Sequence, residues 1–182
     1  MAAQSRSHPV YVTPGLEEAL WFFGMLVLVK ASGEQTGGQY SLTEQHGRRG
    51  VATPLHLQTD DAEMFLVLDG KLTFYLDDEE PIDASAGATA FIPAGSPHAF
   101  EVVSETARWL NLTTPNHEAF FRAAGQPASE RKLPPDMPSV MQAAARFGVE
   151  ILGPPPRITE SRTDEIRVAQ LVNLPSAGEN QG

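Results

Sequence analysis

The sequence contains no cysteine among its 182 residues. That absence excludes disulfide bonds, thiolate metal ligands and cysteine nucleophiles, so any metal ion must be held by histidine, carboxylate or amide groups. Cations are also scarce, because 13 Lys and Arg stand against 23 Asp and Glu, a formal net charge of −10. An acidic chain repels phosphate backbones and anionic lipid surfaces, so we expect neither a nucleic-acid partner nor a membrane partner.

Long apolar segments are missing as well. The longest apolar run, Ala19 to Val29, is far shorter than the roughly 20 residues that cross a bilayer. Residues 1–8 lack the apolar core of a signal peptide. With 41% hydrophobic and only 20% charged residues, the composition is that of a folded protein with a real core, and we expect a cytoplasmic location.

The chain does contain a series of short strand-like segments separated by turn residues. Strands are predicted over residues 8–13, from Trp21 to Val29, and over the segments 39–44, 53–58, 63–69, 71–76, 88–92, 98–103 and 107–113. A helical turn is predicted over Leu16–Leu20, and Asp69-Gly70 predicts a tight type I′ hairpin. Several short strands spaced by about 8–12 residues indicate a closed barrel or sandwich, hence a mainly all-β fold class.

Helical patterns appear only after the strands. Residues 116–124 and 140–147 are helix-like and stop at Gly125 and Gly148. We therefore expect four parts along the chain: a flexible arm over 1–9, a β-barrel over 10–115, a carboxy-terminal appendage with short α-helices over 116–153, and a partly disordered extension over 154–182. The apolar residues within 157–174 are compatible with packing back onto the barrel.

Polar side chains in the middle of the chain are predicted to converge. His56 and Gln58 are two residues apart and share one face of a strand. The polar residues 59–62 form a loop that would pair Gln58 with Glu63 across a hairpin. Histidine, amide and carboxylate groups on one face are candidate metal ligands.

A second stretch runs from Gly87 through a Pro-Ala-Gly turn to a returning strand. On that strand His98, Phe100 and Val102 alternate onto one face. If the barrel closes, His98 meets the first group, and Phe100 and Val102 become candidate walls of a substrate pocket.

Together these residues resemble the two motifs of the cupin superfamily. The first motif, G-x5-H-x-H-x3-4-E-x6-G, is matched by Gly50, His56, Glu63 and Gly70. The second, G-x5-P-x-G-x2-H-x3-N, is matched by Gly87, Pro93, Gly95 and His98. Gln58 stands where the first motif has its second histidine, and Val102 stands where the second motif has asparagine.

The resemblance implies a cupin-type β-barrel, or jelly roll, that binds one divalent transition metal per subunit. By the family pattern, His56, Glu63 and His98 would be ligands, and Gln58 would be a weak or water-mediated one. Iron, nickel, manganese, cobalt, copper and zinc all remain open as the metal. Small cupins commonly dimerise through an exchanged amino-terminal strand, so a homodimer is expected, with residues 10–13 as the candidate strand.

The layout also resembles the small quercetin 2,3-dioxygenase-like cupins of bacteria, through Pro54-Leu55-His56, the segment 67–70 and the segment 92–98. That likeness implies a dioxygenase that cleaves a flavonol-like or other enolic aromatic with O2. Glu63 would serve both as ligand and as the catalytic base that takes the enol proton. Two alternatives stay open: a non-redox cyclase, isomerase or lyase acting on a polyketide-like molecule, and a cupin that binds a small molecule without catalysis.

The remaining candidates have structural interpretations. His46 is expected in a solvated loop and His117 at an exposed helix start, whereas Asp60 and Asp61 are expected to be solubilising loop residues. Aromatic residues are expected in the core or cavity wall (Phe91, Phe100, Trp109), in a core or dimer strand (residues 21–23), or at the contact between helix and barrel, where a lid is the alternative role (residues 120–121).

Overall fold

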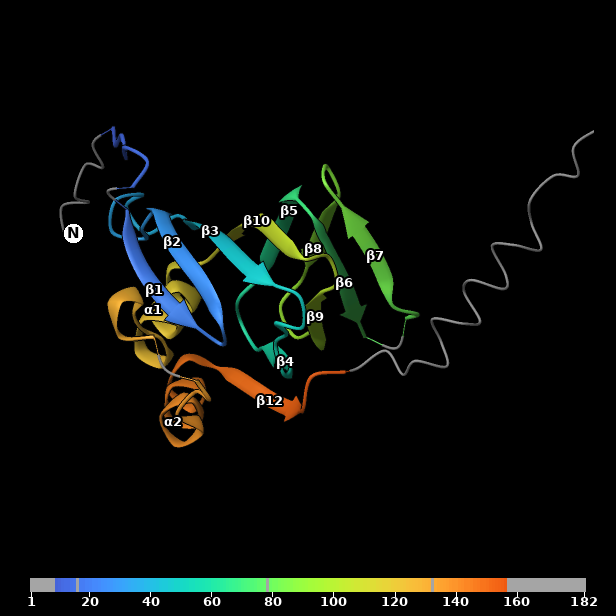
Figure 1. The fold of residues 1–182 in the computed structure, drawn as a ribbon. Helices are drawn as coiled ribbons and strands as arrows, with labels where there is room; N and C mark the ends of the chain where they lie inside the picture. The colour runs from blue at the N-terminus through green and yellow to red at the C-terminus, as the bar shows by residue number, and fades with distance from the viewer. Residues whose placement is uncertain (1–8, 16, 78, 132, 157–182) are drawn as a thin grey trace, which may run out of the picture.

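The computed structural model describes residues 9–15, 17–77, 79–131 and 133–156 as two antiparallel β-sheets with two α-helices at one end (Figure 1). The larger sheet has the strand order β11 (Gln126–Pro127), β1 (Glu18–Phe22), β2 (Met25–Ala31), β3 (Ser41–Arg48), β10 (Thr106–Thr113), β5 (Glu63–Asp69) and β8 (Thr89–Ile92). The smaller sheet has the order β12 (Val149–Gly153), β4 (Leu55–Gln58), β9 (His98–Val102), β6 (Lys71–Leu76) and β7 (Ile82–Ser85). The helices are α1 (Pro115–Ala124) and α2 (Met137–Phe147), with a 3-10 turn, η1 (Ala128–Glu130), between them.

The core lies between the two sheets because their strands alternate inward and outward side chains. In β2, for example, Met25, Val27 and Val29 are buried while the intervening residues are partly exposed. From the opposite sheet, Phe74 and Val102 join the same core cluster. The mainly all-β, two-sheet barrel with short carboxy-terminal helices is therefore confirmed.

The turns within the two motifs connect the sheets rather than closing hairpins. β5 belongs to the larger sheet and β6 to the smaller, so the predicted Asp69-Gly70 hairpin is wrong. Likewise β4 and β5 do not pair, and Gln58 and Glu63 meet across the barrel interior instead of across a hairpin. Local turn chemistry is the same at a hairpin and at a corner between sheets, which explains the error.

Gly70 is required at its corner by a close approach of backbones. A Cβ atom there would lie 2.2 Å from the Thr106 carbonyl oxygen and 2.8 Å from the Ala107 Cα, and the Gly70 φ of 74° is left-handed. Any other residue would therefore push β10 away from the corner.

The amino-terminal elements differ from those predicted. The run from Trp21 to Val29 is a hairpin, β1 and β2, joined by Phe23 and Gly24, and β1 already begins at Glu18 instead of a helical turn. Residues 9–13, the described part of the strand predicted over 8–13, form no strand. Strands β7, β11 and β12 were not predicted.

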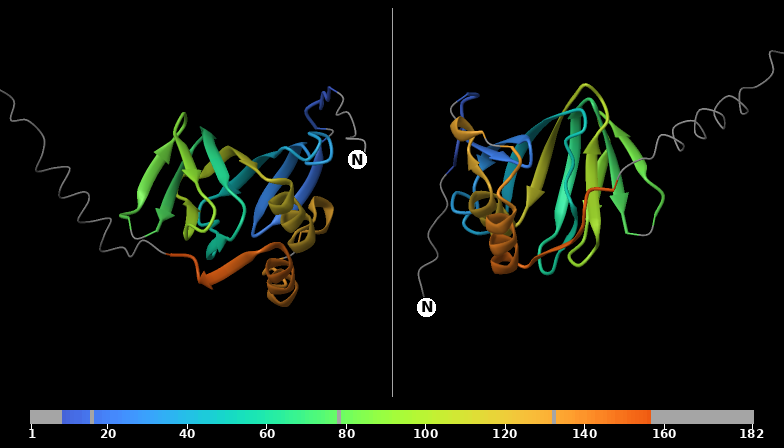
Figure 2. Two further views of the ribbon diagram at one scale, coloured as in Figure 1. Left: turned by 180° about the vertical axis from the view of Figure 1, so that it is seen from behind. Right: turned by 60° about the horizontal axis from the view of Figure 1, so that its bottom comes forward.

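The carboxy-terminal segment contributes a strand to each sheet. Strand β11 pairs with β1, and β12 pairs with β4 beside His56. Figure 2 shows α1 and α2 packed together at one end of the barrel. None of the helices in the described ranges is long and apolar enough to cross a membrane. The predicted extension beyond residue 156 and the arm over 1–8 lie outside the described residues.

Candidate metal centre

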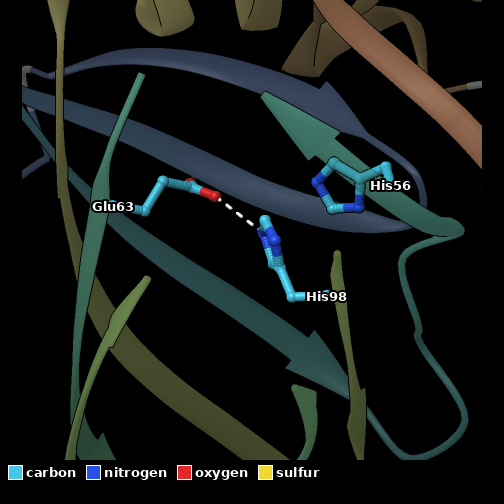
Figure 3. Close-up of side chains that lie close together, drawn as sticks. All are labelled: His56, Glu63 and His98. Carbon is cyan, nitrogen blue, oxygen red and sulfur yellow. Dashed lines mark hydrogen bonds and ion pairs between the residues drawn. The ribbon is translucent and has the colours of Figure 1, made fainter. Parts of the chain in front are cut away.

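Three potential metal ligands converge from both sheets inside the barrel. His56 on β4 and His98 on β9 are directly paired across the smaller sheet, with ring centroids 4.4 Å apart. Glu63 is the first residue of β5 in the larger sheet and points toward the two rings (Figure 3). All three are buried, and one donor atom from each lies within 4.8 Å of the others.

Backbone carbonyl groups orient both imidazoles. His56 Nδ1 donates to the Pro54 carbonyl at 2.8 Å, and His98 Nδ1 donates to the Ser96 carbonyl at 3.0 Å. Because each Nδ1 carries the donated proton, each Nε2 is left as the nitrogen that can bind a cation. This is the arrangement by which proteins hold histidine ligands in a fixed tautomer.

The Glu63 carboxylate is surrounded by hydrogen-bond donors. Oε1 accepts from Asn111 Nδ2 at 2.9 Å and lies 3.3 Å from His117 Nδ1. Oε2 accepts from Gln58 Nε2 at 2.8 Å and lies 3.0 Å from His98 Nε2. Burial alone would raise the pKa of Glu63, but the charges of the surrounding imidazoles and the His98 hydrogen bond lower it, so the side chain is an anion.

The pKa values of the two histidines are shifted in opposite directions. Burial, reinforced by the nearby His98 charge, lowers the pKa of His56 to about 4, so its ring is neutral near pH 7. Burial also disfavours the charged form of His98, but the hydrogen bond and charge of Glu63 outweigh it and raise the pKa of His98. A neutral His56 beside an anionic Glu63 is the protonation state that metal binding requires.

These residues fit a divalent transition metal. Donor atoms bound to one ion at about 2.1 Å lie at most about 4.2 Å apart, so the 4.8 Å cluster needs only a slight contraction. His98 Nδ1–H donates to the Ser96 carbonyl. His98 Nε2 can therefore lie 3.0 Å from Glu63 Oε2 only if a cation, either a proton or a metal ion, lies between the two atoms. Two imidazoles and one carboxylate form the set typical of non-haem iron sites with open positions.

Gln58 is buried beside the three ligands but serves as a donor. Its amide nitrogen bonds to Glu63 Oε2 and lies 3.4 Å from His117 Nε2. A carboxylate only accepts, so the amide NH2 group, and not the carbonyl oxygen, faces it. In this arrangement Gln58 stabilises the carboxylate, and its service as a weak metal ligand stays a prediction.

His117 and Asn111 belong to the site but were not predicted there. His117 is the more informative of the two. It was expected at an exposed helix start, but it is only 2% exposed. Its ring is tilted against Phe121, with centroids 4.5 Å apart, and stacks on Phe120 at 5.8 Å. Its Nδ1 also lies 3.2 Å from Thr113 Oγ1. The spacing of His117, Phe120 and Phe121 is that of the inward face of a helix, which is the signal that could have found it.

Asp61 was expected to be a solubilising loop residue, and that expectation is wrong. It is 4% exposed, accepts from Asn116 Nδ2 at 2.7 Å, and is hydrogen-bonded by the Thr114 hydroxyl. Thr114 in turn caps α1 by accepting from the His117 backbone N–H. Asp61 therefore ties α1, and His117 with it, to the loop that precedes Glu63, whereas Asp60 is exposed as expected.

Other predicted residues divide between the site and the rest of the barrel. Phe100 lines the cavity beside the metal ligands, while Val102 is fully buried in the core cluster and Trp109 is buried there too. His46 lies on β3 rather than in a loop and contacts Glu44 at 3.0 Å. Phe91, expected in the core or cavity wall, is 63% exposed on the outside of β8.

A small cavity adjoins the three ligands. Its volume is about 30 Å³, enough for one or two water molecules. Its wall is mainly aromatic and aliphatic, and its polar lining includes His56, Glu63, His98 and His117. A buried cation would thus face a largely apolar space.

Comparison with known proteins agrees with this fold. Residues 47–113 match the cupin domain. Quercetin 2,3-dioxygenase of Bacillus subtilis (strain 168) is 34% identical over 128 residues, which are 70% of this chain but 38% of that protein. The chain thus spans well under half the length of this relative.

Among solved structures, the polyketide cyclase RemF from Streptomyces resistomycificus has a TM-score of 0.53 and 19% identity, and the match covers 75% of this chain and 99% of the cyclase. A predicted oxalate decarboxylase from Thermotoga maritima has a TM-score of 0.49 and 17% identity, over 54% of this chain and 90% of that one. The chain belongs to the cupin superfamily.

Proposed function

We propose that this cupin is a metal-dependent dioxygenase that acts on an enolic aromatic small molecule of the flavonol type. The observation that carries the proposal is the buried cluster of His56, Glu63 and His98, whose donor atoms lie within 4.8 Å of one another. The relationship to a quercetin 2,3-dioxygenase supports the substrate class. The largely apolar lining of the cavity beside the cluster matches the chemistry of an aromatic ligand.

His56 and His98 would bind the metal through Nε2, and Glu63 through Oε2. Asn111 and His117 hold the other oxygen, Oε1, so the carboxylate presents a single oxygen toward the histidines. Fixed rings and a fixed carboxylate give the site its geometry before the ion binds. The ion could be iron, nickel, manganese, cobalt, copper or zinc, of which the redox-active metals suit an oxygenase.

A bound metal would supply Lewis acidity toward an enol oxygen and, if redox-active, one-electron chemistry with O2. We propose that Glu63 takes the enol proton as the substrate binds. Its anion is stabilised by hydrogen bonds from Gln58 and Asn111, so it is a weak base and serves only an enol that is already acidified. His117, in contact with Glu63 Oε1, is the neighbouring group best placed to stabilise the protonation change.

A second candidate is a non-redox cyclase, isomerase or lyase that uses the metal only as a Lewis acid. Gln58 favours this second candidate. An amide in place of the family's histidine leaves two imidazoles for the metal, so no third imidazole tunes the reduction potential of the metal. A third candidate, a cupin that binds a small molecule without catalysis, requires no metal at all.

Oxygen consumption separates these candidates. Metal-loaded protein is mixed with quercetin in an oxygen-electrode cell, and O2 uptake is compared with substrate loss. The proposal predicts equimolar loss of O2 and quercetin, and no loss with the His98→Ala variant. Turnover of an enolic substrate under strictly anaerobic conditions would establish the non-redox candidate, and metal binding without turnover of any enol in either atmosphere would contradict both enzyme proposals.

A further inference from the structure

Four phenylalanines line the cavity beside the metal ligands. Phe22 and Phe23 come from the turn between β1 and β2, and Phe120 and Phe121 come from α1. Phe22 lies at the centre of the group, with ring centroids 4.7 Å from Phe23, 5.6 Å from Phe120 and 5.4 Å from Phe121. Two segments about 100 residues apart in the sequence thus meet through their aromatic rings at this point.

The cavity beside the metal ligands is too small for the substrate class proposed above. Its volume is about 30 Å³, whereas sites for drug-sized ligands measure roughly 300–1,000 Å³. The metal ligands and the strands that carry them are paired in both sheets, so the space has to come from the surrounding rings. Among these, the Phe23 ring lies in a two-residue turn and is partly exposed, while Phe22, Phe120 and Phe121 are buried.

Phe23 has a backbone conformation that phenylalanine disfavours. Its φ is 47° and that of Gly24 is 86°, so both central residues of the turn are left-handed, as in type I′ hairpins. Asn, Asp and Gly are strongly preferred at such positions because a bulky side chain is strained there. A strained residue whose ring contacts the cavity beside a candidate active site is better explained by ligand contact than by turn formation.

We infer that Phe23 is a specificity-determining residue whose ring packs on the aromatic part of the substrate, with Phe22, Phe120 and Phe121 completing the wall. The inference rests on the proposed function, because it takes an enol group bound at His56, Glu63 and His98 as the fixed end of the ligand. An aromatic extension of that enol then replaces contacts that the phenylalanines make with one another. Stacking and edge-to-face contacts between the phenylalanines and a flat ligand ring offset the loss of contacts among the phenylalanines. An enol without an aromatic extension makes no such contacts.

The test uses two probes with the same metal-binding head. Maltol and 3-hydroxyflavone share the 3-hydroxy-4-pyranone group, but only 3-hydroxyflavone carries fused and pendant aromatic rings. Each is titrated into protein loaded with Zn²⁺, a redox-inert ion that prevents turnover, and binding is followed by absorbance or fluorescence. The variant is Phe23→Asn, which removes the ring and supplies a residue that the turn prefers.

The expected result is an affinity for 3-hydroxyflavone reduced at least about tenfold in Phe23→Asn, an affinity for maltol changed less than about twofold, and a melting temperature no lower than that of the wild type. Asp77→Asn is the matched control, because Asp77 has a similar φ of 49° in the turn after β6 and does not line the cavity. It should leave both affinities unchanged.

Three results would overturn the inference. If both probes bind and Phe23→Asn changes their affinities equally or not at all, Phe23 does not select the aromatic part, and the proposed function stands. If the melting temperature falls and both affinities fall together, Phe23 is a packing residue. If neither probe binds the zinc-loaded wild type, the enol site itself is refuted and the proposed function fails with it.

Discussion

His117 Nδ1 lies 3.3 Å from Glu63 Oε1, which places an α1 side chain in direct contact with the carboxylate of the candidate metal centre. The helix therefore does more than cover the end of the barrel. Through His117 it fixes which carboxylate oxygen faces the other ligands, and through Asp61 the preceding loop fixes the helix. Metal affinity should consequently depend on a residue outside both cupin motifs.

Replacing His117 should weaken metal binding. In His117→Leu, Glu63 Oε1 keeps only Asn111 as a donor, so the carboxylate is less firmly oriented. Loss of such a supporting contact typically lowers metal affinity by about 10- to 100-fold. Zinc affinity measured by competition with a chromophoric chelator provides the test, with His46→Leu on the outer face of β3 as the control. Equal affinities of the two variants would show that His117 does not support the site.

Gln58→His should tighten metal binding. Position 58 lies on the same face of β4 as His56, and its side chain already reaches Glu63 Oε2 at 2.8 Å. An imidazole there adds a third nitrogen ligand, which is stronger than an amide. The same chelator competition should show an affinity at least about tenfold above that of the wild type. An unchanged affinity would mean that the position 58 side chain does not reach the ion.

Asp61→Ala should destabilise the protein. The substitution removes the acceptor for Thr114 and Asn116 at the start of α1 and leaves their donors unpaired in a partly buried position. Each lost hydrogen bond of this kind costs about 1 kcal/mol, so the free energy of unfolding should fall by roughly 2 kcal/mol. Urea denaturation measures it, and Asp60→Ala, at the exposed neighbouring position, should change it by less than about 0.5 kcal/mol.

Gly70→Ala and Gly87→Ala separate backbone conformation from steric conflict. Both glycines have left-handed φ values, 74° and 89°, so both substitutions carry the cost of about 1–2 kcal/mol of placing alanine there. Only at Gly70 does the new Cβ meet other atoms, the nearest 2.2 Å away, whereas nothing lies within 4 Å at Gly87. Gly70→Ala should lower the free energy of unfolding by at least about 1 kcal/mol more than Gly87→Ala. Equal losses would show that the corner can relax.

The sequence was sufficient for the barrel and for three of the buried polar residues, because the two motifs specify both residue type and spacing. His56, Glu63 and His98 could be predicted to meet without any knowledge of the turns between their strands. The turns themselves could not, since a glycine turn between apolar strands is compatible with a hairpin or with a corner between sheets. Only the pairing of β5 with β10 and β8 decides it.

His117, Asp61 and Phe23 escaped prediction for a different reason. Each is polar or aromatic in a segment that is predicted locally as a loop, a helix start or a strand, and its role depends on what packs against it from elsewhere in the chain. Asp61 is buried because α1 lies over it, and His117 because α1 turns that face toward Glu63. Long-range packing of this kind is not encoded in local spacing, although the helical spacing of residues 117, 120 and 121 did indicate a buried face.

The metal centre is tested most directly by the metal content of the purified protein, measured by plasma mass spectrometry before and after reconstitution. We expect about one divalent transition-metal ion per chain in the wild type and less than about a tenth of that in His56→Ala and in His98→Ala, with circular dichroism showing that both variants keep the fold. A wild-type protein that takes up no metal on reconstitution, or ligand variants that retain it stoichiometrically, would contradict the assignment of His56, Glu63 and His98 as a metal site.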